Sequence, residues 1–109
     1  MAILITTTSN VEGMRIARYL GIVTGEASAE VALMAAASAD RPAPGFADAY
    51  HKAIPNVRDN ALRGAIQGAE HVGANAIVGV SVNYIVHGSG KGMVMVTVTG
   101  TAVFIEAIA

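Results

Sequence analysis

The sequence predicts an α+β fold, a two-layer α/β sandwich with an antiparallel sheet and a helix packed on one face, in the order β-β-α-α-β-β. Two β-favouring runs precede a central region with helical periodicity, and two more follow it. Between Val72 and Ile105 the single formal charge is that of Lys91, in a stretch rich in Val, Ile and Thr. A chain of 109 residues is long enough for one hydrophobic core, so we expect residues 1–109 to form a single domain.

The first two strands are expected at Ile3 to Thr7 and at Arg15 to Val23, with a loop around the sequence SNVEG between them. The alanine-rich run from Ala27 to Ala39 predicts a short helix, because alanine has the highest intrinsic helix propensity. The sequence DRPAPG, from Asp40 to Gly45, is typical of a linker and separates this helix from the next one.

A longer amphipathic helix is predicted by apolar residues that recur at spacings of three and four between Ile54 and Val72. We expect it to end at Gly73, since glycine readily adopts the left-handed conformation of a helix C-cap. Pro55 cannot donate an interior helical hydrogen bond. The helix therefore either begins at Pro55 or is kinked there, within a longer helix that begins near Phe46.

The last two strands are expected at Ala76 to Val86 and at Met93 to Ile105, joined by a hairpin turn in HGSGKG, from His87 to Gly92. The second strand alternates between one face that is aliphatic or small and one that is half polar. The first strand is mostly apolar on both faces, and a domain of this size offers one helix layer to cover it. We therefore expect the other face to be covered by a second subunit.

The composition also predicts a homo-oligomer. Hydrophobic residues make up 53% of the chain and charged residues 14%, compared with about a quarter charged in a typical globular domain. The net charge of -1 includes no basic excess for neutralising phosphates, so we expect neither nucleic acid nor a membrane as partner. Five glycines, together with Asn75, Ser81 and Asn83, argue against a membrane span in the charge-poor stretch.

Several chemistries are disfavoured by the residues present. A chain without cysteine forms no disulfide, thiolate metal site or cysteine nucleophile. The hydroxyl groups from Thr6 to Ser9 are expected to form hydrogen bonds with backbone groups of a turn. The sequence contains no recognisable spacing of a nucleophile, a base and an orienting group. We therefore expect a protein that is not an enzyme and needs no cofactor. The N-terminal sequence lacks a basic leader and a signal-peptide core, so a cytoplasmic location is expected.

Three histidines, His51, His71 and His87, are candidate metal ligands if the fold or a symmetry axis gathers them. The simpler interpretation gives them surface or capping roles. In particular, His71 falls in the last turn of the longer helix, where a partly charged imidazole interacts favourably with the helix dipole.

Three blocks resemble the YbjQ-like family of small bacterial and archaeal proteins. They are GIVTGEA (Gly21 to Ala27), GANAIVGVSVNY (Gly73 to Tyr84) and MVMVTVTGTAV (Met93 to Val103). The resemblance implies a dodecin-like arrangement of β and α layers and a ring, typically a pentamer. The family is described as heavy-metal-binding, so the resemblance also implies a metal-binding role. At Ser81 and Asn83, however, this chain has neutral residues where many relatives carry acidic ones.

The resemblance makes Glu26 the acidic residue of most interest, with Thr24 and Asn83 as further candidate ligand-binding residues. The simpler interpretation is that Glu26 caps a helix beginning at Ala27. The first functional hypothesis is a non-enzymatic, ring-forming protein that binds a small ligand or ion at its subunit interfaces. The alternative is a metal-binding or metal-sensing protein, with Glu26 and the three histidines as its candidate ligands.

Overall fold

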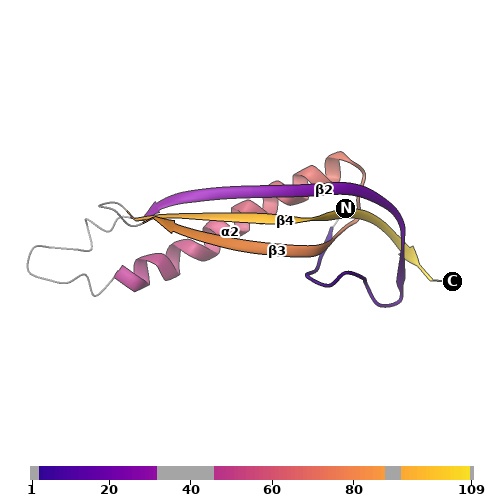
Figure 1. Ribbon diagram of the computed structural model, residues 1–109, viewed down its shortest axis with the longest axis horizontal. Coiled ribbons are helices and arrows are strands. Elements are labelled where there is room, and N and C mark those ends of the chain that lie inside the picture. Colours follow the sequence, from indigo (N-terminus) through magenta and orange to yellow (C-terminus); the bar gives the residue numbers. More distant parts are fainter. Residues whose placement is uncertain (1–2, 32–45, 88–91, 109) are drawn as a thin grey trace, which may run out of the picture.

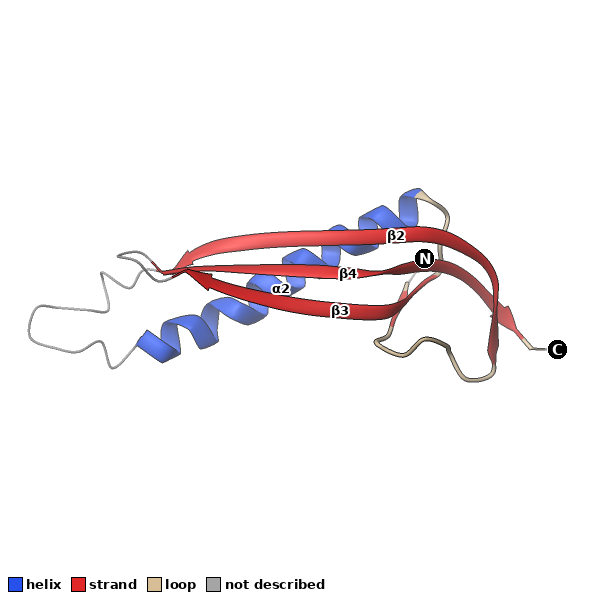
Figure 2. Cartoon of the chain, in the orientation of Figure 1, coloured by secondary structure: helices blue, strands red, loops and turns tan. Residues whose placement is uncertain are grey.

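A computed structural model describes residues 3–31, 46–87 and 92–108, which form an α+β fold with one helix packed on a four-stranded mixed sheet (Figure 1). Strands β2, β3 and β4 lie side by side, and α2 crosses one face of the sheet (Figure 2). The elements are β1 (Leu4–Ile5), β2 (Met14–Val31), α2 (Phe46–His71), β3 (Ala76–His87) and β4 (Gly92–Ala107).

The sheet has the strand order β1-β3-β4-β2. β4 pairs antiparallel with β3, as the predicted hairpin requires, and antiparallel with β2 on its other side. Residues 88–91 of the predicted turn lie outside the described residues. β1 instead pairs parallel with β3, through Leu4 with Ala76 and Ile5 with Ile77, so the expectation of a wholly antiparallel sheet is wrong. A parallel pair needs a long crossover connection, and β2 with α2 provides one between β1 and β3.

The predicted helix from Ala27 to Ala39 is wrong where the structure describes it, and the described elements follow the order β-β-α-β-β. Ala27 to Val31 continue β2, which pairs with β4 without interruption from Ile22 to Val31. Helix propensity amounts to a few tenths of a kcal/mol per residue, so strand pairing and packing override it here. Residues 32–39 and the linker from Asp40 to Gly45 lie outside the described residues.

Of the two predicted starts of the amphipathic helix, the one near Phe46 is confirmed, since α2 begins at Phe46 and contains Pro55. Its end is also confirmed. Gly73 has a φ of 81°, in the left-handed region, and its N–H donates to the carbonyl oxygen of Glu70 at 3.1 Å. The N–H of Ala74 donates to the carbonyl oxygen of Ala69 at 3.0 Å, which closes the cap. The cap turns the chain directly into β3.

Small residues bring α2 very close to the sheet. Gly25 of β2 is buried, and a Cβ atom there would lie 1.9 Å from the carbonyl oxygen of Ala61. A Cβ atom on Gly64 would lie 3.4 Å from the Cα atom of Gly25. The helix backbone therefore rests on the strand backbone at this point. Around this contact, the main core joins apolar residues of α2 and the sheet, among them Val57, Ala65, Val94, Val96 and Val98.

The molecule is elongated, with extents of 65 × 23 × 20 Å and a radius of gyration of 17.8 Å. A compact domain of this length has a radius of gyration of about 13 Å. A second, smaller core is formed where Val11 and the first residues of β2 pack against β3 and β4. Its buried residues are Ala76, Val78, Val103 and Ile105. In the described part of the chain, no helix is long and apolar enough to span a membrane.

Candidate functional site

One face of the sheet has no helix over it. Val94, Val96 and Val98 of β4 are buried beneath α2, and the residues that alternate with them point to the opposite side. Strand register then assigns the neighbouring residues of β2 and β3 to the same side. We call this surface the open face. Its residues are Ile22, Thr24, Glu26, Ser28, Ser81, Asn83, Ile85, Met93, Met95, Thr97, Thr99 and Thr101.

The candidate residues Thr24, Glu26 and Asn83 come together on the open face. Thr97 of β4 pairs with Glu26 on one side and with Asn83 on the other. Thr99 pairs in the same way with Thr24 and Ser81. We call these six residues the polar rows. They combine three threonine hydroxyls, a serine hydroxyl, a carboxamide and a carboxylate, so they can both donate and accept hydrogen bonds.

The polar rows are accessible. Glu26, Thr24, Asn83 and Ser81 are exposed, and the threonines of β4 between them are half-buried. Within the described part of the chain, no side-chain hydrogen bond or ion pair engages these six residues. An open hollow of about 260 Å³ lies beside Glu26 and is also lined by Ala27, Ser28 and Met95. The rows therefore offer unused hydrogen-bonding groups on an accessible surface.

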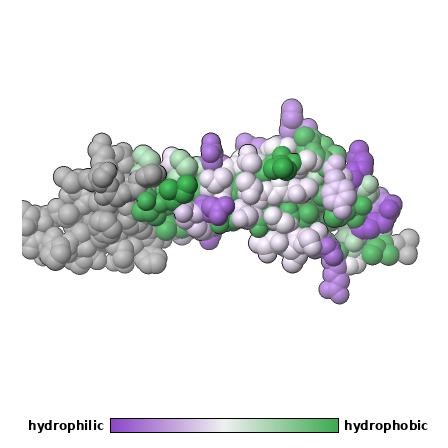
Figure 3. Space-filling model, in the orientation of Figure 1, coloured by the Kyte–Doolittle hydropathy of each residue, from purple (hydrophilic) through white to green (hydrophobic). Residues whose placement is uncertain are grey.

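Apolar side chains flank the polar rows. Ile22 is 80% exposed and lies next to the row that contains Thr99. Ile85 and Met93 are exposed and lie on the far side of the row that contains Thr97. Tyr19, 72% exposed, pairs with Val103 further along β2. Among the residues that are coloured in Figure 3, pale and hydrophobic ones cover the middle of the molecule, and hydrophilic ones gather towards one end. Tyr84 and Val86 on the α2 side of β3 are exposed as well. A cluster of large exposed apolar side chains is typical of an interaction surface.

The interpretation of Glu26 as a helix cap is wrong, because Glu26 lies within β2 and Ala27 continues that strand. His71 is exposed in the last turn of α2, and α2 lies on the side of the sheet opposite to Glu26. The side chains of His51 and His87 lie outside the described part of the structure. A single chain thus does not bring Glu26 and His71 together.

No group of three or more potential metal-ligating side chains occurs among the residues that the structure describes. The hydroxyl cluster near the N-terminus behaves as expected from the sequence. Thr8 Oγ1 donates to the carbonyl oxygen of Asn10 at 2.6 Å, and the N–H of Thr8 donates to Thr6 Oγ1 at 3.1 Å. These hydroxyls stabilise a turn.

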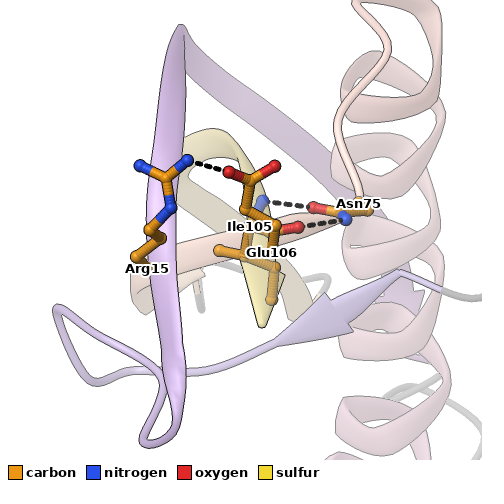
Figure 4. Close-up of polar contacts among 4 residues, drawn as sticks. All are labelled: Arg15, Asn75, Ile105 and Glu106. Atoms are coloured by element: carbon orange, nitrogen blue, oxygen red, sulfur yellow. Dashed lines mark hydrogen bonds and ion pairs between the residues drawn. The ribbon is translucent and has the colours of Figure 1, made fainter. Parts of the chain in front are cut away.

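Sequence reasoning missed one polar contact at the end of the sheet. The Asn75 side chain donates from Nδ2 to the carbonyl oxygen of Ile105 at 2.9 Å and accepts at Oδ1 from the N–H of Ile105 at 2.7 Å (Figure 4). Beside it, Arg15 forms an ion pair with Glu106 (Figure 4). An asparagine directly between a helix cap and a strand was the available sequence signal. The contact is structural and lies apart from the open face.

Comparison with known proteins connects this architecture to a family. A family model described as "Putative heavy-metal-binding" matches residues 3–106. Proteins named "UPF0145 protein" from Listeria monocytogenes and Listeria innocua are 41% identical over 106 residues, which is 95% of this chain and 96% of each relative. A crystal structure of a protein with unknown function from Pediococcus pentosaceus matches with a TM-score of 0.71 and 21% identity, covering 95% of this chain and 98% of that one. This last similarity concerns the fold.

Proposed function

This chain belongs to the YbjQ-like family, and we propose from that premise that it is a non-enzymatic protein that assembles into a closed ring, a pentamer, and binds a small ligand or ion between its subunits. The proposal depends chiefly on one observation, the open face. Ile22 and its apolar neighbours on that face are exposed in the single chain, and their burial against other copies would stabilise an assembly.

The shape of the chain supports assembly as well. A radius of gyration of 17.8 Å shows that the chain is extended. Its long sheet carries α2 on one face, and in the described part of the chain the open face has no helix over it. A layer over this face would be supplied by neighbouring subunits, as an oligomer interface resembles part of a core. A ring is one symmetric way for identical copies to cover one another.

The polar rows support the ligand part of the proposal. Each chain contributes a single carboxylate there, from Glu26, alongside hydroxyl and amide groups. In a ring this carboxylate is repeated by symmetry, so several copies would supply the anionic oxygens that one chain lacks. Oxygen donors of this type suit a polar organic ligand or a hard cation.

The alternative of a metal-binding or metal-sensing protein requires the same symmetry. Glu26 and His71 lie on opposite sides of the sheet, so a site containing both would need contributions from different copies. The family description favours this alternative, and the geometry of a single chain does not. The two proposals differ in the mass that a purified ring would retain.

Native mass spectrometry of the untagged protein, purified without a chelator, tests the proposal. We expect a single species of five chains with a defined additional mass that identifies the ligand class. An empty ring would contradict the ligand part and leave the assembly intact. A metal mass in stoichiometric amount would favour the alternative, and a monomer would overturn the proposal as a whole.

A further inference from the structure

Among the residues that the structure describes, the sheet has two incompletely paired edges, one on each side. β2 is an outer strand over its full 18 residues, with β4 as its neighbour. On the other side, β1 and the backbone of Thr6 and Thr8 pair with β3 as far as Val80. From Ser81 to His87, β3 has β4 as its one neighbour among the described residues.

The free part of β3 presents defined hydrogen-bonding groups. The N–H of Val80 donates outward, to the carbonyl oxygen of Thr6 at 3.1 Å. Because alternate residues of a strand direct their N–H and C=O groups to the same side, Val82, Tyr84 and Val86 present theirs outward too. On β2, every second residue does the same along the opposite edge.

Among the described residues, the two edge segments 22–28 and 81–86 lack the usual protection against pairing. Natural edge strands are guarded by proline, by lysine or by covering segments. The part of β2 from Ile22 to Ser28 contains neither proline nor lysine, and its one charged residue is Glu26. Residues 81–86 of β3 carry no charge. The remainder of β2 differs, since Arg15, Arg18 and two register shifts interrupt a regular edge there.

The directions of the strands determine how two edges can meet. β2 and β3 are both antiparallel to β4, so they run in the same direction on opposite sides of the sheet. Pairing β2 of one copy with β3 of the next is therefore head-to-tail and repeatable, and it closes into a ring when the rotation per copy allows. Pairing β2 with β2, or β3 with β3, joins two copies only and leaves the other edges free.

We infer that β2, between Ile22 and Ser28, pairs in parallel with the free part of β3 of a second copy, so that the sheet continues from one subunit into the next. This inference rests on the proposed ring and specifies its interface. It places the open faces of neighbouring copies on the same side of a continuous sheet, so that in a closed ring with the helices outside these faces are directed towards one another across the interior. The polar rows of one subunit then adjoin those of the next, which gives the proposed ligand site its symmetry.

Residue-resolved hydrogen exchange on the intact wild-type assembly tests the inference, with the molar mass measured on the same sample. β4 provides the reference for full protection, because it has a neighbour on both sides, and the loop amides of Ser9 and Asn10 provide the reference for rapid exchange. We expect the outward amides of Val82 and Tyr84, and every second amide from Ile22 to Ser28, to exchange on the order of 100-fold or more slowly than the loop amides.

Each other outcome is informative. Protection of the outward amides on β2 alone would indicate pairing of β2 with β2 and would overturn the inference. Rapid exchange at both edges in a sample that is oligomeric would also overturn it, while leaving the proposed ring in place. Rapid exchange at both edges in a monomeric sample would overturn the ring and the inference together.

Discussion

Gly25 of β2 lies directly beneath Ala61 of α2, so close that a Cβ atom on Gly25 would be 1.9 Å from the Ala61 carbonyl oxygen and 2.6 Å from the backbone nitrogen of Ala65. Backbone atoms of a helix cannot move aside as a flexible side chain can. This contact therefore fixes the separation between the helix and the sheet, and every open-face residue is positioned by a sheet held at that separation.

Substitution of Gly25 by alanine should destabilise the fold by about 3 kcal/mol or more, since overpacking against an unyielding neighbour has at least the usual penalty. The matched control is Gly68→Ala on the facing side of α2, where a Cβ atom would make an ordinary contact of 3.7 Å with the Val23 side chain. Alanine in a helix should stabilise the control by about 0.5–1 kcal/mol. Urea unfolding measures both, and equal stabilities would contradict the close contact.

The paired hydrogen bonds between Asn75 and Ile105 predict that Asn75→Asp is destabilising. Aspartate cannot donate to the Ile105 carbonyl oxygen and places negative charge beside it. We expect a loss of about 1–3 kcal/mol in the free energy of unfolding. Asn56→Asp, at an exposed position of α2, should change the stability by about 0.5 kcal/mol or less. A similar effect of the two substitutions would show that the Asn75 contact has no stabilising role.

Ile22→Asp should weaken assembly without unfolding the chain. The Ile22 side chain is 80% exposed, so the single chain tolerates a charge there, whereas a covered open face does not. We expect loss of about 2 kcal/mol or more per interface, a fall in molar mass by light scattering and an unchanged circular dichroism spectrum. Gln67→Asp, exposed on α2, should leave the molar mass unchanged. An Ile22→Asp assembly as stable as wild type would exclude the open face from the interface.

Val96 and Thr97 are adjacent in β4 but lie on opposite faces, so aspartate at each should have different effects. Val96 is fully buried beneath α2, and an unpaired carboxylate there should prevent cooperative folding. Thr97 lies on the open face, so Thr97→Asp should retain the secondary structure of the wild type. Thermal unfolding followed by circular dichroism distinguishes the two. Cooperative unfolding of both variants at similar temperatures would contradict the assignment of faces.

Glu26→Gln should remove any mass that the wild-type ring retains, because the carboxamide keeps the shape of the side chain but not its charge. His71→Gln is the comparison, since His71 lies on the other side of the sheet at the end of α2. We expect native mass spectrometry to show an empty Glu26→Gln ring and a loaded His71→Gln ring. If the His71→Gln ring alone lost the ligand, the binding site would lie at α2 and not on the open face.

The sequence predicted those elements that local signals determine. The cap at Gly73, the apolar face of α2 and the pairing of β3 with β4 follow from glycine conformation, apolar periodicity and hairpin patterning. Whether the helix begins at Pro55 or near Phe46 was left open by the sequence. The extension of β2 through Ala27 could not be predicted in this way. Alanine favours a helix locally, and what places it in a strand is pairing with Val96, far away in the sequence.

The sequence predicted individual residues of the candidate site, but it did not predict how they lie relative to one another. Glu26 and Asn83 lie on different strands and become neighbours of the same residue, Thr97, through the register of two strand pairs. No spacing along the chain encodes that register. The parallel pairing of β1 was missed for the same reason, because two residues pairing across a long connection leave no local pattern.

The molar mass of the untagged wild-type protein, measured by light scattering after size exclusion and over a series of dilutions, tests the central claim most directly. A ring held together by the open face and the edges of the sheet should give one mass equal to five chains that persists on dilution. A mass equal to one chain at every concentration would mean that the open face is simply a solvated surface, and it would contradict the proposed assembly.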